Sequence, residues 1–331
     1  MTIYDIACKA GVSTATVSRV LNHTGRVSEE SRRKVEEVIA REGFIPNAFA
    51  HSLTTKRSHT IGMICPVISD ANHAYPVAEL TGQLRENGFE VLLISTGSYT
   101  ESKRAGFASL INHQAEAAVV IGCSEDEQEA EDFRYAAARL PVFIVNGRVE
   151  GENIYSILCD EEAGACGMVK RLADMGRRQI LYLYDSDTYS GHCKRRGYEE
   201  GMRRYTGEEP FTVRIVGEET SSFFQTKETV SRLLAGRPFD AVLSADDSLA
   251  IGAAKALREA GRDPVPMIGF NNTVLGRCAT PELSSFDIDM KQLCRLTVRT
   301  LLDVLQGQTA PSCLKLEGKL VERASLLDFE S

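Results

Sequence analysis

The sequence has no run of about 18 apolar residues, the length that a transmembrane helix requires. Its first residues, MTIYDIACKAG, lack the basic start and apolar stretch of a secretory signal, which predicts a cytoplasmic protein without membrane contact. Common enzyme motifs are also missing: there is no G-x-G-x-x-G after the first expected strand, and no G-x-x-x-x-G-K-[ST], G-x-S-x-G or H-E-x-x-H. We therefore expect neither catalytic residues nor a cofactor.

Paired cysteines are lacking too. The nine Cys residues are odd in number and scattered, and no two of them form C-x-x-C. This excludes a disulfide framework and argues against a zinc site or another metal centre. We expect the thiols to behave as small buried apolar groups in a reducing compartment.

Charge is distributed unevenly along the 331 residues. The whole chain has a formal net charge of −8, but residues 1–58 contain nine Lys/Arg and six Asp/Glu, which gives +3 and leaves −11 for the rest. A basic head on an acidic body indicates that the head alone contacts a polyanion. The length predicts two or three domains.

The basic head reads as three short helices, over residues 4–10, 14–22 and 28–42. Gly11 permits a tight corner after the first helix, and Ser13 is placed to cap the second. Val17, Val20 and Leu21 give that second helix a narrow apolar stripe. Two helices joined by a glycine turn have helix-turn-helix geometry, in which the second helix enters the major groove of DNA.

The second helix carries small and hydroxyl side chains suited to that groove. Thr14 and Ala15 would contact base edges or a thymine methyl group, and Arg19 would bind a guanine. Thr16 and Ser18 would bond phosphates. The alternative is an ordinary solvated helix of a three-helix bundle.

From residue 61 onward, short apolar strands alternate with amphipathic helices. The strands are expected at 61–67, 90–95, 117–122, 142–146, 180–184, 213–216, 241–245 and 266–270, and the helices at 76–86, 161–175, 220–235 and 248–260. This alternation predicts parallel sheets covered by helices. Similar sets before and after Ile154 favour an α/β core of two Rossmann-like lobes, with a ligand in the cleft between them.

The chain resembles the LacI/GalR family of bacterial transcription regulators. The resemblance begins at 2–22, TIYDIACKAGVSTATVSRVLN, and continues through 27–53, VSEESRRKVEEVIAREGFIPNAFAHSL, to 265–273, VPMIGFNNT, and Pro281–Leu283. It implies a helix-turn-helix head at 1–46, a hinge helix or linker at 47–58, and a periplasmic-binding-protein-like core at 59–331. We divide the core into an N-lobe, about 59–157 plus 288–311, and a C-lobe, about 158–287 plus 312–331.

The resemblance also implies roles for residues of the head and hinge. Thr14, Ala15 and Arg19 would read bases, while Ser13, Thr16, Ser18 and Asn22 would contact the DNA backbone or cap the helix. Leu53 matches the leucine that wedges into the minor groove, with Asn47 and Ala50 beside it. Without the resemblance, Leu53 would be read as a linker residue that packs on the core.

The pocket residues depart from the family pattern. Lys194 stands at the position of a usual Arg, and Asn271 and Asn146 stand where many members have Asp. Lysine lacks the planar fork of arginine, and this set tilts the expected ligand toward an anion. The predicted lining residues are Asp70, His73, Asn146, Lys194, Asp246 and Asn271. His73 has an alternative as a surface loop residue, and the Asp246–Asp247 pair as a helix cap.

These observations predict a DNA-binding repressor that acts as a homodimer on a near-palindromic operator and responds to a small-molecule effector, a sugar or sugar phosphate. Binding of the effector to one of two states would change DNA affinity. A partner protein as the effector, a solute-binding protein with a degenerate head, and an enzyme acting on a sugar or nucleoside are the alternatives. The residues after Glu322 lack apolar heptads, which favours a dimer over a tetramer.

Overall fold

The structure, a computed structural model, describes residues 2–21, 25–43, 58–97, 103–216, 222–327 and 329. The chain divides into two compact units, Met1–Ser58 and His59–Ser331, which are treated separately below. In the described part of the chain, every helix is too short or too polar to cross a membrane.

The first unit is a bundle of three helices, α1 (Ile3–Ala10), α2 (Thr14–Leu21) and α3 (Glu29–Glu42). Gly11 has a φ of 64°, which lets the chain turn sharply after α1. The backbone N–H of Thr16 donates to Ser13 Oγ at 3.1 Å, so Ser13 caps α2 as predicted. One small core holds the bundle together, formed by the buried side chains of Ile6, Ala7, Ala10, Val17, Val20, Val35 and Val38.

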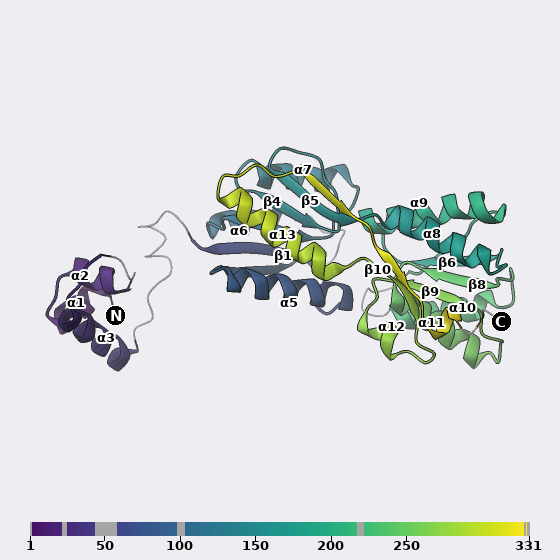
Figure 1. Cartoon of the computed structure of the whole chain (residues 1–331), viewed down its shortest axis with the longest axis horizontal. Coiled ribbons are helices and arrows are strands. Elements are labelled where there is room, and N and C mark those ends of the chain that lie inside the picture. The colour runs from purple at the N-terminus through teal and green to yellow at the C-terminus, as the bar shows by residue number, and fades with distance from the viewer. Residues whose placement is uncertain are drawn as a thin grey trace. The chain divides into compact units, whose positions relative to one another are not determined.

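The second unit contains two six-stranded sheets, one in each lobe (Figure 1). The N-lobe sheet is entirely parallel, in the order β11-β5-β4-β3-β1-β2. Its strands are β1 (Thr60–Cys65), β2 (Glu90–Ser95), β3 (Ala117–Ile121), β4 (Val142–Val145), β5 (Ile154–Cys159) and β11 (Cys313–Leu316).

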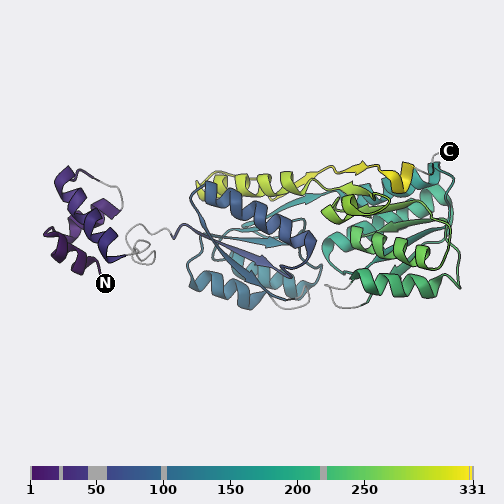
Figure 2. The ribbon, with the colours of Figure 1, turned by 90° about the horizontal axis from the view of Figure 1, so that it is seen from below.

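Helices cover both faces of the N-lobe sheet (Figure 2). They are α5 (Ala71–Glu86), α6 (Arg104–Asn112), α7 (Glu127–Ala137) and α13 (Met290–Leu305). Adjacent strand residues serve opposite faces, since Met63 packs in the cluster with Leu80 of α5, whereas Ile64 packs in the cluster with Phe107 of α6. Burial on both faces explains why these strands are almost continuously apolar.

The C-lobe sheet has the order β12-β10-β9-β8-β6-β7, and its β10–β12 pair is antiparallel. The strands are β6 (Ile180–Tyr184), β7 (Phe211–Arg214), β8 (Ala241–Ser244), β9 (Met267–Phe270), β10 (Ser284–Asp287) and β12 (Lys319–Val321). The helices are α8 (Glu161–Asp174), α9 (Tyr189–Gly201), the π-helical η1 (Met202–Thr206), α10 (Ser222–Leu233), α11 (Asp247–Glu259), α12 (Val274–Cys278) and α14 (Ala324–Leu327). The described residues confirm the predicted fold class.

The chain crosses between the lobes three times: after β5, after β10 and after β11. The expected lobe division therefore needs correction. A boundary at 157/158 would cut β5, and β11 belongs to the N-lobe because it pairs with β5 in parallel. The C-terminal segment thus contributes one strand to each sheet.

Two local expectations were also wrong. The strand β5 was not anticipated, and α5 begins at Ala71 instead of Pro76. Asp70 accounts for the earlier start, because its Oδ1 accepts a hydrogen bond from the Asn72 N–H at 2.8 Å. Pro76 lies inside the helix.

Candidate functional site

The helix α2 presents part of the predicted DNA-reading set to solvent. Ala15 and Arg19, four residues apart and therefore on one helix face, are exposed. Thr14, Thr16 and Ser18 are half-buried, and the Thr16 hydroxyl lies 2.9 Å from Ser13 Oγ. The available surface of α2 is thus dominated by one methyl group and one guanidinium.

The remaining predicted DNA contacts, Asn22, Asn47, Ala50 and Leu53, lie outside the described residues.

A cavity of about 1460 Å³ lies between the lobes of the second unit. Its wall includes all six predicted ligand residues: Asp70, His73, Asn146, Lys194, Asp246 and Asn271. They come from both lobes, and all but Lys194, which lies in the second turn of α9, follow strand ends or stand at helix starts, as expected for ligand sites in doubly wound sheets. The fold therefore brings predicted residues that lie up to 201 positions apart in the sequence to one cavity.

Lys194, on α9, is buried and already paired. Its Nζ lies 3.3 Å from Glu161 Oε1 at the start of α8 and donates to the carbonyl oxygen of Ala245 at 3.0 Å. The same ammonium lies 4.7 Å from the centre of the Phe270 ring. The expected free cation for an anionic ligand is thus absent at this position, because Glu161 compensates its charge.

Asn146 and Asn271 both adopt left-handed backbone conformations, with φ of 54° and 81°. Asparagine tolerates this region better than most non-glycine residues, so the local backbone gives a reason for Asn at each position. Asn146 Nδ2 donates to Glu161 Oε1 at 3.3 Å, and Asn271 Oδ1 accepts from Lys194 Nζ at 3.4 Å. Both amides therefore belong to the Lys194–Glu161 cluster.

Asn72, which the sequence analysis did not single out, bridges the two lobes inside the cavity. Its Nδ2 donates to Asp246 Oδ2 at 2.7 Å, and its Oδ1 accepts from Asn271 Nδ2 at 2.9 Å. The sequence pattern predicts that α5 begins at residue 76, so it does not place Asn72 on a helix. These two hydrogen bonds hold the first turn of α5 against the C-lobe wall.

Two adjacent carboxylates stand at the start of α11 in the C-lobe, and Asp246 lines the cavity. Asp246 caps α11 by accepting from the Ser248 N–H at 2.7 Å, so it and not Asp247 is the cap. Asp247 is fully buried and accepts from the Thr273 N–H and from the hydroxyl groups of Thr273 and Ser285. Burial, reinforced by Asp246, raises the pKa of Asp247 to about 6.

Asp185 was also missed by the sequence analysis. It follows β6, lines the cavity and accepts a hydrogen bond from Ser222 Oγ at 2.8 Å. Burial, with repulsion from Asp246 second, raises its pKa to about 6. Two carboxylates from neighbouring strand ends thus face the same space.

His73 lines the cavity and is not the surface loop residue that the sequence left as its alternative. It is buried in the first turn of α5, and its Nδ1 lies 2.9 Å from the carbonyl oxygen of Val67. The ring therefore forms part of the cavity wall and ties the helix to the loop after β1.

Among the described residues, no group of three or more His, Cys, Asp or Glu side chains is placed to hold a metal ion.

Known protein families match both units of the chain. The family model described as "Bacterial regulatory proteins, lacI family" matches residues 2–47, and "Periplasmic binding protein-like domain" matches residues 169–326. An HTH-type transcriptional regulator of Lachnoclostridium phytofermentans is 36% identical over 330 residues, covering 98% of both chains. The lactose operon repressor of Escherichia coli is 29% identical, covering 99% of this chain and 91% of the repressor.

Solved structures agree. A crystal structure of the lac repressor dimer bound to operator and the anti-inducer ONPF aligns with a TM-score of 0.87 at 26% identity, covering 98% of this chain and 99% of that one.

Proposed function

Because this chain belongs to the LacI family of bacterial transcription regulators, which are DNA-binding proteins and not enzymes, we propose that it is a repressor whose operator affinity is set by a neutral, polyhydroxylated effector. The cavity wall is the observation that supports a neutral effector. Glu161 neutralises its buried cation, Lys194, while Asp185 and Asp246 remain as hydrogen-bond acceptors. We place its action in the cytoplasm, where the chromosome of a bacterium lies.

Carboxylates and amides suit hydroxyl groups because each oxygen accepts a hydrogen bond that a sugar hydroxyl can donate. A phosphate offers only acceptors at its oxygens when fully ionised, so Asp185 and Asp246 would repel it. The other cations on the described lining, Arg214, Arg277 and Lys291, are exposed to solvent, where their attraction is screened. A neutral sugar therefore fits this wall better than a sugar phosphate.

The DNA half of the proposal rests on α2 and the hinge. Two heads of a homodimer would present Thr14, Ala15 and Arg19 to the half-sites of a near-palindromic operator, while Thr16, Ser18 and Asn22 contact the backbone. Leu53, with Asn47 and Ala50 beside it, would wedge into the central minor groove. The lac repressor structure, a dimer bound to operator, supports this arrangement.

Selection of bound fragments from a genomic pool, followed by fluorescence anisotropy, tests the DNA half. We expect sequence-selective binding that weakens steeply with salt. Leu53→Ala should weaken binding to the selected site far more than binding to random duplex. Equal losses on both would remove the wedge role, and no selective binding under any ligand condition would overturn the repressor assignment.

Thermal-shift screening against neutral sugars, sugar phosphates and nucleobases tests the effector half. A ligand at 100 times its dissociation constant should stabilise the protein by about 2.7 kcal/mol. Asp246→Asn should weaken a sugar, because an amide accepts less strongly than a carboxylate. A sugar phosphate that binds better than its parent sugar would overturn the proposed effector class.

A further inference from the structure

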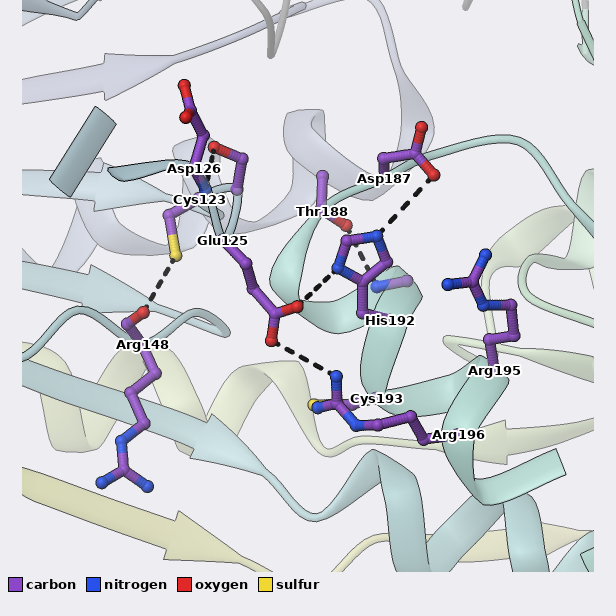
Figure 3. A network of polar contacts seen from close by, with 12 residues as sticks. Cys123, Glu125, Asp126, Arg148, Asp187, Thr188, His192, Cys193, Arg195 and Arg196 are labelled. Atoms are coloured by element: carbon purple, nitrogen blue, oxygen red, sulfur yellow. Dashed lines mark hydrogen bonds and ion pairs between the residues drawn. The ribbon is translucent and has the colours of Figure 1, made fainter. Parts of the chain in front are cut away.

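A chain of polar contacts joins side chains of the two lobes (Figure 3). We call Glu125, His192 and Arg196 the interlobe latch. Glu125 belongs to the N-lobe, in the loop between β3 and α7, whereas His192 and Arg196 lie on α9 of the C-lobe. His192 Nδ1 lies 2.6 Å from Glu125 Oε2, and Arg196 Nη1 donates to Glu125 Oε1 at 3.3 Å. One carboxylate is thus held by two side chains of the other lobe.

The backbone crosses at the same place. The N–H of Tyr189 donates to the carbonyl oxygen of Cys123 at 2.8 Å, and Ser124 and Thr188 form an isolated antiparallel bridge. Tyr189 is the first residue of α9, where an N–H has no acceptor within its own helix. This amide therefore depends on the N-lobe for its hydrogen bond, and it loses that bond whenever the lobes separate here.

Charged groups face His192 from each element packed against it. Asp187 Oδ1, from the loop after β6, lies 3.7 Å from His192 Nε2, opposite Glu125 on the other ring nitrogen. Arg214 of β7 holds the other oxygen of Asp187 at 2.6 Å. Arg196 in turn pairs with Glu162 of α8, its Nε 3.1 Å from Oε2.

An imidazole between two carboxylates responds to protonation. A neutral ring has one N–H and can donate to only one of its two neighbours, whereas an imidazolium donates from both nitrogens. Histidine is the side chain that ordinarily changes its charge between about pH 5 and 8. Opening the lobes removes Glu125 from the ring, so only the latched arrangement offers a carboxylate to both N–H groups of an imidazolium.

We propose that the interlobe latch is proton-dependent: protonation of His192 stabilises the contact between Glu125 and α9 and so favours closed lobes. A ligand that binds one of two states more tightly shifts the equilibrium toward it, and a proton acts here as such a ligand. Glu125, Asp187 and His192 also line the cavity, so the effector and the proton act on the same movement. Any resulting change in operator affinity rests on the proposed function.

Hydrogen exchange of the Tyr189 amide tests the latch without DNA or effector, so its outcome is independent of the proposed function. Exchange is followed in the full chain at about pH 6 and pH 8, with mass-spectrometric fragmentation to resolve Tyr189, and is corrected for the intrinsic pH dependence of amide exchange. We expect the protection of Tyr189 to be about two- to five-fold higher at the lower pH, the range of one partly exposed ion pair.

Variants separate the latch from a general effect of pH. His192→Gln should abolish the pH difference, and Glu125→Gln should lower protection at both pH values and flatten the difference. His113→Gln is the matched control. His113 is exposed at the C-terminal end of α6 in the N-lobe, and its Nδ1 lies 2.8 Å from the carbonyl oxygen of Ser109 in that helix. Equal protection at both pH values in the unmodified chain, or a pH difference that survives in His192→Gln, would overturn the proposal.

Discussion

Asn72 of the N-lobe and Asp246 of the C-lobe are joined across the cleft by a hydrogen bond of 2.7 Å from the Asn72 Nδ2 to the Asp246 Oδ2. Asn271 Nδ2 donates to the same oxygen at 3.2 Å. One carboxylate oxygen therefore serves both lobes, and a ligand hydroxyl that binds Asp246 has to share or replace the amide of Asn72.

Asn72→Ala should loosen the lobes. A hydrogen bond to a charged group contributes about 1.5–3 kcal/mol, so we expect the protection of the interlobe Tyr189 amide to fall by about 10- to 150-fold. Asn87→Ala is the matched control, because Asn87 ends the same helix and its amide donates only to Gln83 there. A similar loss of protection in both variants would contradict a role across the cleft.

Lys194→Met should destabilise the C-lobe by about 3–5 kcal/mol, because it leaves the buried Glu161 carboxylate without its cation. The double variant Lys194→Met, Glu161→Gln should recover most of this loss, since no uncompensated charge remains. Urea unfolding of the two single variants and the double variant gives the coupling energy. Additive losses would show that the pair does not act as a unit.

Asp185→Asn should stabilise the protein in a pH-dependent way. The folded-state pKa of Asp185, about 6, exceeds the ordinary value of 3.8, so the folded protein holds this proton while the unfolded chain has lost it. The contribution of the Asp185 carboxyl to the free energy of unfolding is therefore fully present below about pH 4 and is lost as pH rises to about 6.

The gain from Asp185→Asn should accordingly grow between about pH 4 and 6 and then stay constant, with a ceiling of about 3 kcal/mol that partial solvation of this half-buried group lowers. The difference in unfolding free energy between the two proteins, measured across this range, checks it. A difference that does not vary with pH would contradict the prediction.

Gly197→Ala should destabilise the contact between α8 and α9. A Cβ on Gly197 would lie 2.1 Å from the backbone carbonyl oxygen of Glu162, so the helices would have to separate, at a cost of about 1–3 kcal/mol. Gly167→Ala on α8 meets nothing within 4 Å and should instead gain about 0.8–1 kcal/mol from helix propensity. Thermal unfolding compares the two, and equal effects would refute the close approach.

Arg19→Ala should reduce operator affinity by about 1–3 kcal/mol and relax specificity at one base pair, the effect of losing a two-pronged base contact. Arg33→Ala is the control, because Arg33 is also exposed but lies on α3, with its Nε 3.5 Å from Glu37 Oε1. Anisotropy on the selected site and on random duplex distinguishes the roles. An equal loss on both would identify Arg19 as a phosphate contact.

Local signals in the sequence were sufficient for the head. The cap at Ser13 and the turn at Gly11 involve residues within a few positions of each other, so the pattern alone locates α2. The strands that are buried on both faces could likewise be predicted, because each is a short apolar run.

Pairing between segments that are distant in the sequence could not be predicted from such local patterns. The strand β5 contains Tyr155 and Ser156 among its apolar residues and is defined by pairing with β4 and with β11, whose paired residues lie 157 positions later. The charge of Lys194 was misjudged for the same reason, because Glu161 reaches it only after α8 and α9 pack together. Ligand positions could be placed from strand ends, but the interactions among them required the fold.

The three crossings between the lobes have a consequence for biosynthesis. The N-lobe lacks its edge strand until β11 (Cys313–Leu316) is made, and the C-lobe lacks β12 (Lys319–Val321), only two residues further on. Neither lobe can finish folding while the ribosome is still translating the other. The head, complete within its first 43 residues, can fold long before either of them.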